Sequence, residues 1–220
     1  MAQVIIFGVK DLAELAHYYL LTDSEHKVVA FSVNKEYLPK GNTFKGLPVF
    51  AFEEIEKKLP PTDYSFFAPM THRGMNKERE RIYNEIKNKG YSLINYISSR
   101  ATIFDNLIAG ENCFILEANI IQPFVNIGSN TVLWSGNHIG HHSRIGDHVF
   151  ITSHVVISGN CIIEPYCFIG VNSALKENTT LEEATFVAMS TSITKSTEPY
   201  SVYSGNPAKK IDMSSLKIRF

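Results

Sequence analysis

Residues 121–151, IQPFVNIGSNTVLWSGNHIGHHSRIGDHVFI, place an aliphatic side chain at every sixth position. The same step of six runs from Ile97 to Ile193, and sixteen of its seventeen positions hold Ile, Leu or Val, the remaining one being Ala109. These three residue types make up about a fifth of an average chain, so chance does not explain the run. The regularity indicates one repeating structure over about a hundred residues.

A second register, of smaller residues, accompanies the aliphatic one. Two positions before most of the aliphatics stand slim side chains such as Cys113, Thr131 and Ser143. Residues two apart in a strand face the same side, so each six-residue unit sends one large and one small side chain inward. A period of six is the signature of a parallel β-helix, whereas a β-sandwich, the alternative, would show uneven spacing with Gly- and Pro-rich turns.

The repeat resembles the left-handed β-helix of hexapeptide-repeat transferases, which is a triangular prism with three short strands and about 18 residues in each coil. On that resemblance, the seventeen units make about five to six coils. Stacked at ~4.8 Å per strand, these coils would form a prism roughly 25 Å tall.

Residues 1–96 lack this period and alternate between strand-like and helix-like segments. Strands are expected at Val4–Phe7, Lys27–Val33, Tyr64–Ala68 and Ser92–Tyr96, and helices over Leu12–Tyr19, Phe52–Leu59 and Asn76–Lys89. The alternation predicts a small Rossmann-like α/β domain with a parallel sheet.

Ligands of such a sheet bind beyond the carboxyl ends of the strands, here near Gly8, Asn34 and residues 70–73. Only Gly8 remains of the glycine pattern that binds dinucleotides, so a nicotinamide site is not indicated. Two readings stay open, a site for a nucleotide-linked substrate and a packing domain without a ligand.

The composition is that of an ordinary globular protein. Lys plus Arg number 21 and Asp plus Glu 22, for a formal net charge of −1, so neither nucleic acid nor a membrane surface is an expected partner. No apolar run approaches the ~20 residues that span a bilayer, and the first residues do not resemble a signal peptide, so a cytoplasmic protein is expected. The three cysteines occupy the small inward register and form no C-x-x-C pair, which favours a role in the core.

Five of the eight histidines fall between positions 138 and 154, namely His138, His141, His142, His148 and His154. In coils of about 18 residues, side chains stack only at separations near that number or its double, and no two of these histidines are so spaced. A metal held within one chain is therefore not expected, while a site shared between subunits stays open.

His141 is the best candidate for a general base. It follows Gly140 at a corner of the repeat, and Gly159 stands one coil further on, where the missing side chain leaves room for a ligand. An exposed imidazole can accept the proton of an amine or hydroxyl that attacks a thioester. Covalent catalysis has little support, because no serine lies on the strand-to-helix turn that activates such a nucleophile.

The two-part layout, the segment from Gly136 to Gly146 and the tail Gly205-Asn206-Pro207-Ala208-Lys209 together resemble a family of bacterial sugar acyltransferases. This is the sialic acid O-acetyltransferase-like family, which includes nucleotide-amino-sugar N-acetyltransferases. The resemblance implies that His141 is the base, that acyl-CoA is the co-substrate without a metal, and that homotrimers carry active sites between subunits. It divides the chain into residues 1–96 for the nucleotide sugar, 97–198 for the β-helix and 199–220 for a capping tail that contacts CoA.

The resemblance also suggests binding residues. Candidates for contact with CoA are Gly159, Lys176, Gly205, Pro207 and Lys209, and candidates for contact with the nucleotide sugar are Gly8, Lys10, Asn34 and Thr71. Candidates for orienting His141 or touching the acceptor are His142, Asn137, His138 and His154.

We therefore predict acyl transfer, most simply of acetyl, from acyl-CoA to the amine of a nucleotide-linked amino-deoxy sugar, for a surface glycan such as O-antigen. The alternatives are an O-acetyltransferase acting on a sugar hydroxyl, a non-catalytic trimer that binds sugar nucleotides, and a metal enzyme with its site between subunits.

Overall fold

The computed structural model describes residues 1–219, which form two compact units. The first unit combines Met1–Thr71 with Arg81–Tyr96, and the second combines His72–Glu80 with the chain from Ile97 onward. The segment His72–Glu80 thus belongs to the same unit as the repeats, although Arg81–Tyr96 of the first unit lies between them in the sequence. Among the described residues, no helix is long and apolar enough to cross a membrane.

The first unit is an α/β sheet with the strand order β3-β4-β2-β1-β5. The strands are β1 (Gln3–Phe7), β2 (Lys27–Val33), β3 (Thr43–Phe44), β4 (Leu47–Ala51) and β5 (Ser65–Phe67), all pairing in parallel except β3 with β4. The helical elements are α1 (Asp11–Thr22), most of α2 (Lys77–Asn88), and the 3-10 turns η1 (Lys35–Tyr37), η2 (Lys40–Asn42) and η3 (Phe52–Lys57). The prediction of a small α/β domain with a parallel sheet is thereby confirmed as a fold class.

Three details of this unit differ from the expectation. The strand predicted over Ser92–Tyr96 is found only in part, because Leu93 makes an isolated parallel bridge with Phe66 and Tyr96 opens the first strand of the β-helix, β6 (Tyr96–Ile97), without a continuous strand between them. The hairpin of β3 and β4 was not expected, because a glycine turn and Pro48 interrupt its apolar residues. The helix expected over Phe52–Leu59 is a 3-10 helix that ends at Lys57.

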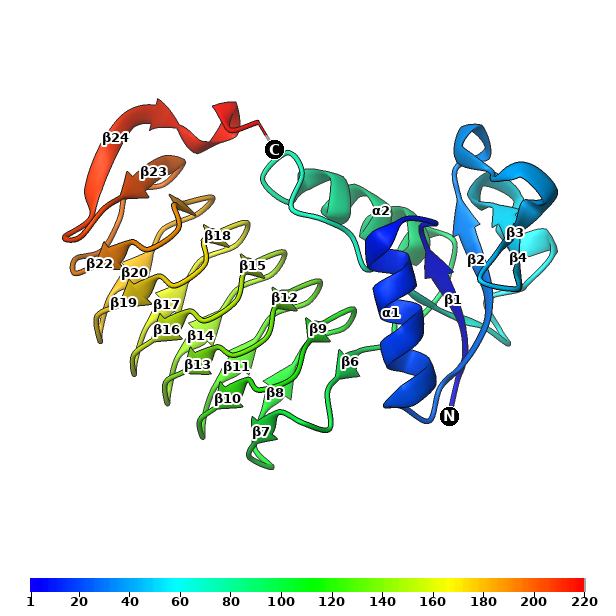
Figure 1. Cartoon of the computed structure of the whole chain (residues 1–220), viewed down its shortest axis with the longest axis horizontal. Coiled ribbons are helices and arrows are strands. Elements are labelled where there is room, and N and C mark those ends of the chain that lie inside the picture. Colours follow the sequence, from blue (N-terminus) through cyan, green and yellow to red (C-terminus); the bar gives the residue numbers. More distant parts are fainter. Residues whose placement is uncertain (220) are drawn as a thin grey trace. The chain divides into compact units, whose positions relative to one another are not determined.

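The second unit is a parallel β-helix whose two-residue strands stack in three columns (Figure 1). The first column contains β7 (Thr102–Ile103), β10 (Ile120–Ile121), β13 (His138–Ile139), β16 (Val156–Ile157), β19 (Ala174–Leu175) and β22 (Ser192–Ile193). The second contains β8 (Ile108–Ala109), β11 (Asn126–Ile127), β14 (Arg144–Ile145), β17 (Ile162–Ile163) and β20 (Thr180–Leu181). The third contains β6 (Tyr96–Ile97), β9 (Phe114–Ile115), β12 (Val132–Leu133), β15 (Phe150–Ile151), β18 (Phe168–Ile169), β21 (Phe186–Val187), β23 (Ser201–Ser204) and β24 (Lys209–Ser214).

Within a column, each strand pairs with the strands one coil before and one coil after it, as Ile139 does with Ile121 and Ile157. The coil length expected from the repeat is thereby confirmed. The stack ends in a hairpin, in which β23 adds to the third column in parallel and β24 returns antiparallel beside it, followed by the 3-10 turn η4 (Ser215–Lys217).

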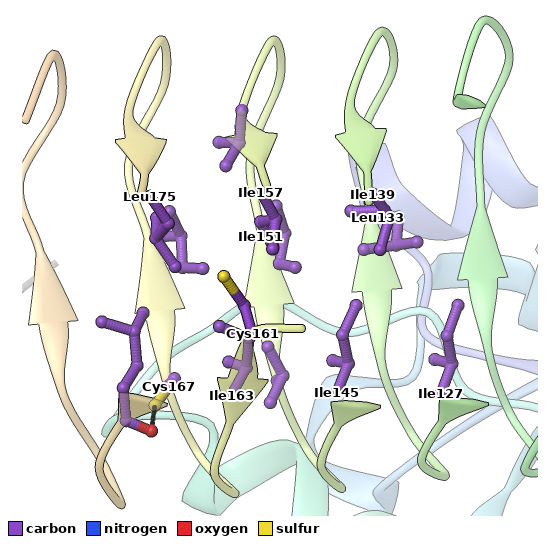
Figure 2. Packing of buried hydrophobic residues seen from close by; sticks show 14 of the residues in the cluster. Ile127, Leu133, Ile139, Ile145, Ile151, Ile157, Cys161, Ile163, Cys167 and Leu175 are labelled. Carbon is purple, nitrogen blue, oxygen red and sulfur yellow. Dashed lines mark hydrogen bonds between the residues drawn. The ribbon is translucent and has the colours of Figure 1, made fainter. Parts of the chain in front are cut away.

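Both inward registers are buried as predicted. The aliphatic positions from Ile115 to Ile193 are at most 3% exposed and form one continuous core. Figure 2 shows Ile127, Ile145 and Ile163 aligned along one edge of this interior, with Cys161 and Cys167 pointing into it. Burial raises the pKa of the Cys167 thiol to about 12, which keeps this sulfur protonated and unreactive.

The segment His72–Glu80 covers part of the third column. His72 packs its ring against Phe150 and Phe168, at centroid distances of 4.8 and 4.6 Å. Arg79 is fully buried, and its Nη2 donates hydrogen bonds to the carbonyl oxygens of His148 and Val149. The segment His72–Glu80, which is not part of the repeat, thus shields outward-facing phenylalanines of this column from water.

Candidate active site

His141 lies at an exposed corner of the β-helix, directly after β13. A Cβ atom built on Gly159, one coil later, would lie 2.7 Å from Cε1 and 2.9 Å from Nε2 of the His141 ring. Gly159 does not have a left-handed φ, so its backbone conformation would suit any residue. The glycine is required by the position of the imidazole, which occupies the space that a side chain at 159 would fill.

A second imidazole adjoins the first. Nδ1 of His141 lies 3.1 Å from Nδ1 of His142, and the two ring planes are 85° apart. The backbone N–H of His141 donates to Oε1 of Gln122 at 2.9 Å, and the His142 ring packs against Phe124 with a centroid distance of 4.6 Å. The backbone of His141 is therefore bonded to Gln122, and its ring is in contact with that of His142.

The corner that carries His141 continues toward the tail as a row of equivalent positions, His141, Gly159, Glu177 and Lys195, which we name the His141 row. Successive coils are joined along it by backbone bonds from Asn160 N–H to His141 O (2.9 Å) and from Asn178 N–H to Gly159 O (3.1 Å). At ~4.8 Å per coil, the row spans about 14 Å. Lys176 is exposed and immediately precedes its third position.

The tail turn contacts β22, the last strand of the first column, which also contains β13. Ser192 of β22 donates its N–H to the carbonyl of Gly205 at 3.0 Å and accepts from Ala208 N–H at 2.9 Å. Pro207, in a cis peptide with Asn206, and Lys209, which opens β24, belong to this exposed turn. The five candidates for CoA contact therefore lie along the β-helix from Gly159, the second position of the His141 row, to the tail turn at the end of the coils.

The remaining histidine-segment candidates lie in different environments. Asn137 is 1% exposed, its Nδ2 donates to Trp134 O, and its Oδ1 accepts from Val155 N–H. Its amide is therefore hydrogen-bonded to the backbone of two successive coils, and the acceptor contact expected from Asn137 stays a prediction. His138 is half-buried on the outer face of β13 between Ile120 and Val156.

His154 occupies another corner. It is exposed, and a Cβ on Gly136 would lie 2.8 Å from its Nδ1 and Cε1, so this ring also lies over a glycine. His148, by contrast, is 9% exposed and stacks on Tyr166 with a centroid distance of 5.2 Å and 16° between the planes. The structure thus brings His141 and His142 into contact, whereas His148 and His154 lie at other corners of the β-helix.

The His148 corner is built from polar side chains. Nδ1 of His148 pairs with Nδ2 of Asn130 at 2.9 Å, and the Tyr166 hydroxyl donates to Oε1 of Glu80 at 2.7 Å. Lys77 places its Nζ 3.5 Å from the centroid of the Tyr166 ring and 3.1 Å from Glu80. Burial lowers the pKa of His148. The positive charges of Arg79 and Lys77 lower this pKa as well, whereas the negative charges of Glu80 and Asp147 raise it.

Beside this corner lies a groove of about 420 Å³ lined by Asp147, His148, Glu164, Pro165, Tyr166, Glu182 and Glu183. Among residues 1–219, no group of three or more His, Cys, Asp or Glu side chains is arranged to hold a metal ion. The groove is acidic but has no metal-binding geometry, and it lies on a different corner from His141.

The α/β unit places its four candidates at the carboxyl ends of neighbouring strands. Gly8 (φ +118°) follows β1, Lys10 is the N-cap residue of α1, Asn34 follows β2, and Thr71 follows β5 after three residues. The strand order changes direction between β1 and β5, and ligands of open α/β sheets bind at such a point.

Sequence reasoning missed Glu53 in this unit. Its carboxylate accepts the N–H of Lys35 at 3.0 and 3.1 Å, and Nδ2 of Asn34 lies 3.5 Å from its Oε1. It reaches the end of β2 only because η3 follows the adjacent strand β4, which no local pattern indicated. Gln122 and Phe124 were also missed, although Phe124 stands one coil before His142 and the coil length could have found it.

Comparisons with known proteins match this architecture. The family model of the bacterial transferase hexapeptide (six repeats) matches residues 124–159. A variant of perosamine N-acetyltransferase from Caulobacter crescentus, in complex with CoA and GDP-perosamine, aligns with a TM-score of 0.86 and 19% identity over 97% of this chain and 98% of that chain.

Two further solved structures align over nearly the whole chain. The acetyltransferase domain of PglB from Neisseria gonorrhoeae FA1090 has a TM-score of 0.82 and 17% identity over 96% of this chain and 100% of that one. WeeI from Acinetobacter baumannii AYE has a TM-score of 0.72 and 20% identity over 96% and 100%. The expected resemblance to hexapeptide-repeat sugar acyltransferases is thereby confirmed at the level of the fold, which is a small parallel α/β region followed by a left-handed β-helix of hexapeptide repeats.

Proposed function

We propose that this chain transfers an acyl group, most simply acetyl, from acyl-CoA to the amine of a nucleotide-linked amino-deoxy sugar. Perosamine N-acetyltransferase, which shares the fold over 97% of this chain, is described in complex with CoA and GDP-perosamine, and PglB contributes an acetyltransferase domain of the same fold. The observation that carries the proposal is the exposed His141 ring over Gly159, at the start of a row that leads to the tail turn.

The reaction is a direct transfer. The sugar amine attacks the thioester carbonyl, and Nε2 of His141 accepts the proton that the amine loses. The tetrahedral intermediate then collapses, the carbon–sulfur bond breaks, and the proton passes to the departing CoA sulfur. The product is an amide on the sugar and free CoA, so no metal is required for the balance of the step.

Acyl-CoA lies along the His141 row in this proposal. An elongated pantetheine arm would run along the row of about 14 Å that begins at His141, with its thioester beside that ring. Lys176 and Lys209 would face the phosphates, and Gly205 and Pro207 would border the nucleotide end. Residues 97–198 thus act as the acyltransferase domain and residues 199–220 as the tail that contacts CoA.

The nucleotide of the sugar donor binds residues 1–96. Gly8, Lys10, Asn34 and Thr71 gather at the carboxyl ends of β1, β2 and β5, where backbone N–H groups and a cation suit a diphosphate. The enzyme is a homotrimer, in which a neighbouring subunit completes the surface beside the exposed His141. The product serves a surface glycan.

The test is CoA thiol release from acetyl-CoA with a panel of nucleotide-linked 3-amino and 4-amino sugars. We expect turnover with one amino sugar and a loss of about 10²–10⁴-fold in kcat for His141→Ala. Added imidazole should restore part of the activity of His141→Ala. Asn172→Gly, a change at another corner of the β-helix, should keep the native activity.

Turnover that survives His141→Ala would remove His141 as the base. Turnover only with hydroxyl sugars would make the enzyme an O-acetyltransferase. Binding of a sugar nucleotide without any turnover would favour a binding trimer. Light scattering should give three times the monomer mass, and a monomer at assay concentration would contradict a site shared between subunits.

A further inference from the structure

The His141–His142 contact restricts which nitrogen of each ring carries a proton. A neutral imidazole has one N–H and one acceptor nitrogen, so two Nδ1 atoms 3.1 Å apart can pair only if one donates and the other accepts. The His141 ring lies over the position that a Cβ on Gly159 would take, with Nε2 2.9 Å and Nδ1 3.2 Å from it, and Nδ1 is the nitrogen that pairs with His142. For Nε2 to accept a proton, Nδ1 of His141 must carry the N–H and donate it to His142.

We infer that His142 is a positioning residue, which accepts the Nδ1–H of His141 and thereby keeps Nε2 of His141 unprotonated and able to accept a proton. The inference rests on the proposed function for its kinetic consequences, but the hydrogen bond itself is independent of any substrate. In this arrangement His142 carries its own proton on Nε2, so a neutral ring performs the orienting role that a carboxylate performs in a Ser-His-Asp triad.

Three contacts hold His142 in place for this role. Its backbone has a left-handed φ of +60°, and its N–H donates to the carbonyl of Pro123 at 3.3 Å. The Phe124 ring, from the same corner one coil earlier, packs against its ring with an interplanar angle of 37°. Because Phe124 is 58% exposed, its packing against His142 is not explained by burial in the core.

The left-handed backbone decides which substitutions are informative. Glycine adopts this conformation without strain, so His142→Gly removes the ring while it preserves the corner. Asparagine also tolerates the conformation, as Asn160 shows one coil later with φ +56°, and its side-chain oxygen can accept a hydrogen bond. His142→Asn therefore restores an acceptor without a second imidazole, and Asn172→Gly is the matched control for a glycine at a left-handed corner (φ +59°).

The first measurement is the tautomer of His141 by long-range ¹H–¹⁵N correlation on protein with labelled histidine, assigned through His141→Ala. We expect His141 with Nδ1 protonated and Nε2 unprotonated in the native chain and in His142→Asn, and a shift toward the Nε2-protonated form in His142→Gly. A native His141 protonated on Nε2 overturns the inference, whether or not any substrate is turned over.

The second measurement is kinetic, with the amino sugar that supports turnover. His142→Gly should lower kcat by about 10–100-fold with little change in KM for acetyl-CoA, since an orienting partner acts on the chemical step. His142→Asn should recover most of this loss. His142→Asp should move the acid limb of the kcat/KM profile to higher pH, because a carboxylate stabilises the protonated imidazole.

Equal losses in His142→Gly and His142→Asn would overturn the inference, as would a kcat of His142→Gly within twofold of the native value. The failure of the proposed function looks different. In that case no amino sugar would be turned over, while the tautomer measurement would still decide the hydrogen bond.

Discussion

Two corners of the same β-helix carry histidines at equivalent positions of the repeat and use them in opposite ways. His142 and His148 stand one repeat apart, both with left-handed backbones of φ +60° and +59°. His142 is exposed beside His141, whereas His148 is buried against Tyr166 and the segment His72–Glu80. The repeat sets the backbone of both corners, and the segment packed on one of them decides which histidine meets solvent.

The comparison separates two kinds of effect. Changes at the His141 corner should alter the rate and leave the fold intact, because its side chains lie outside the core. Changes at the His148 corner should alter stability, because Arg79, Glu80 and Tyr166 bind a distant segment to the coils.

After His141→Ala itself, the largest effect is expected from Gly159→Ala, which should lower kcat/KM by about 10²–10³-fold. The new methyl group would occupy the position of the His141 ring, 2.7 Å from Cε1, and displace the base. The backbone at 159 accepts alanine, so circular dichroism and thermal unfolding should stay close to those of the native chain. The double variant with His141→Ala should be no slower than His141→Ala alone; additive losses would show that Gly159 serves a separate purpose.

Arg79→Ala should lower the free energy of unfolding by about 3 kcal/mol, measured by urea denaturation, because it leaves a cavity and removes the donor to two buried carbonyls. These carbonyls belong to His148 and Val149, and that of Val149 keeps the N–H of Val132. Arg79→Met keeps most of the volume and should lose less. At a temperature where the variants remain folded, kcat should stay within a few-fold of the native value, and a rate loss as large as that of His141→Ala would break the separation of the two corners.

Tyr166→Phe tests a single hydrogen bond of the same corner and should cost about 1 kcal/mol. Its hydroxyl donates to Glu80 at 2.7 Å, and the phenylalanine keeps the stacking on His148. Thermal unfolding beside Tyr64→Phe, a tyrosine of the other unit, provides the control. Equal destabilisation of both variants would mean that the bond to Glu80 contributes nothing specific.

The smallest effect concerns pH. Burial lowers the pKa of His148 and of His72, so in the folded chain both remain neutral at a pH where the unfolded chain already binds protons. Stability should therefore fall as the pH drops below the ordinary histidine value of about 6.5. His148→Asn, which suits the left-handed corner, should show a shallower fall in melting temperature between neutral pH and about pH 5. An unchanged slope would assign the effect to other groups.

Much of the architecture could be predicted from the chain because its determinants are periodic. The six-residue step correctly predicted the β-helix, the coil length and the burial of both inward registers. The strand expected over Ser92–Tyr96 is interrupted, because a short apolar stretch does not specify where along its length it pairs. The hydrogen bonds of the Asn137 amide were not predicted, because they depend on the backbone of a neighbouring coil.

The sequence by itself determined where the interior of the β-helix lies and that His141 falls at a corner, one coil before a glycine. These properties depend on spacing along the chain, and a fixed coil length converts spacing into position. Only the tertiary structure decided that His141 pairs with His142, that Phe124 packs behind the pair, that Glu53 reaches Asn34, and that His72–Glu80 buries His148. These contacts depend on rotamers and on segments far apart in sequence, and no repeat of six residues encodes them.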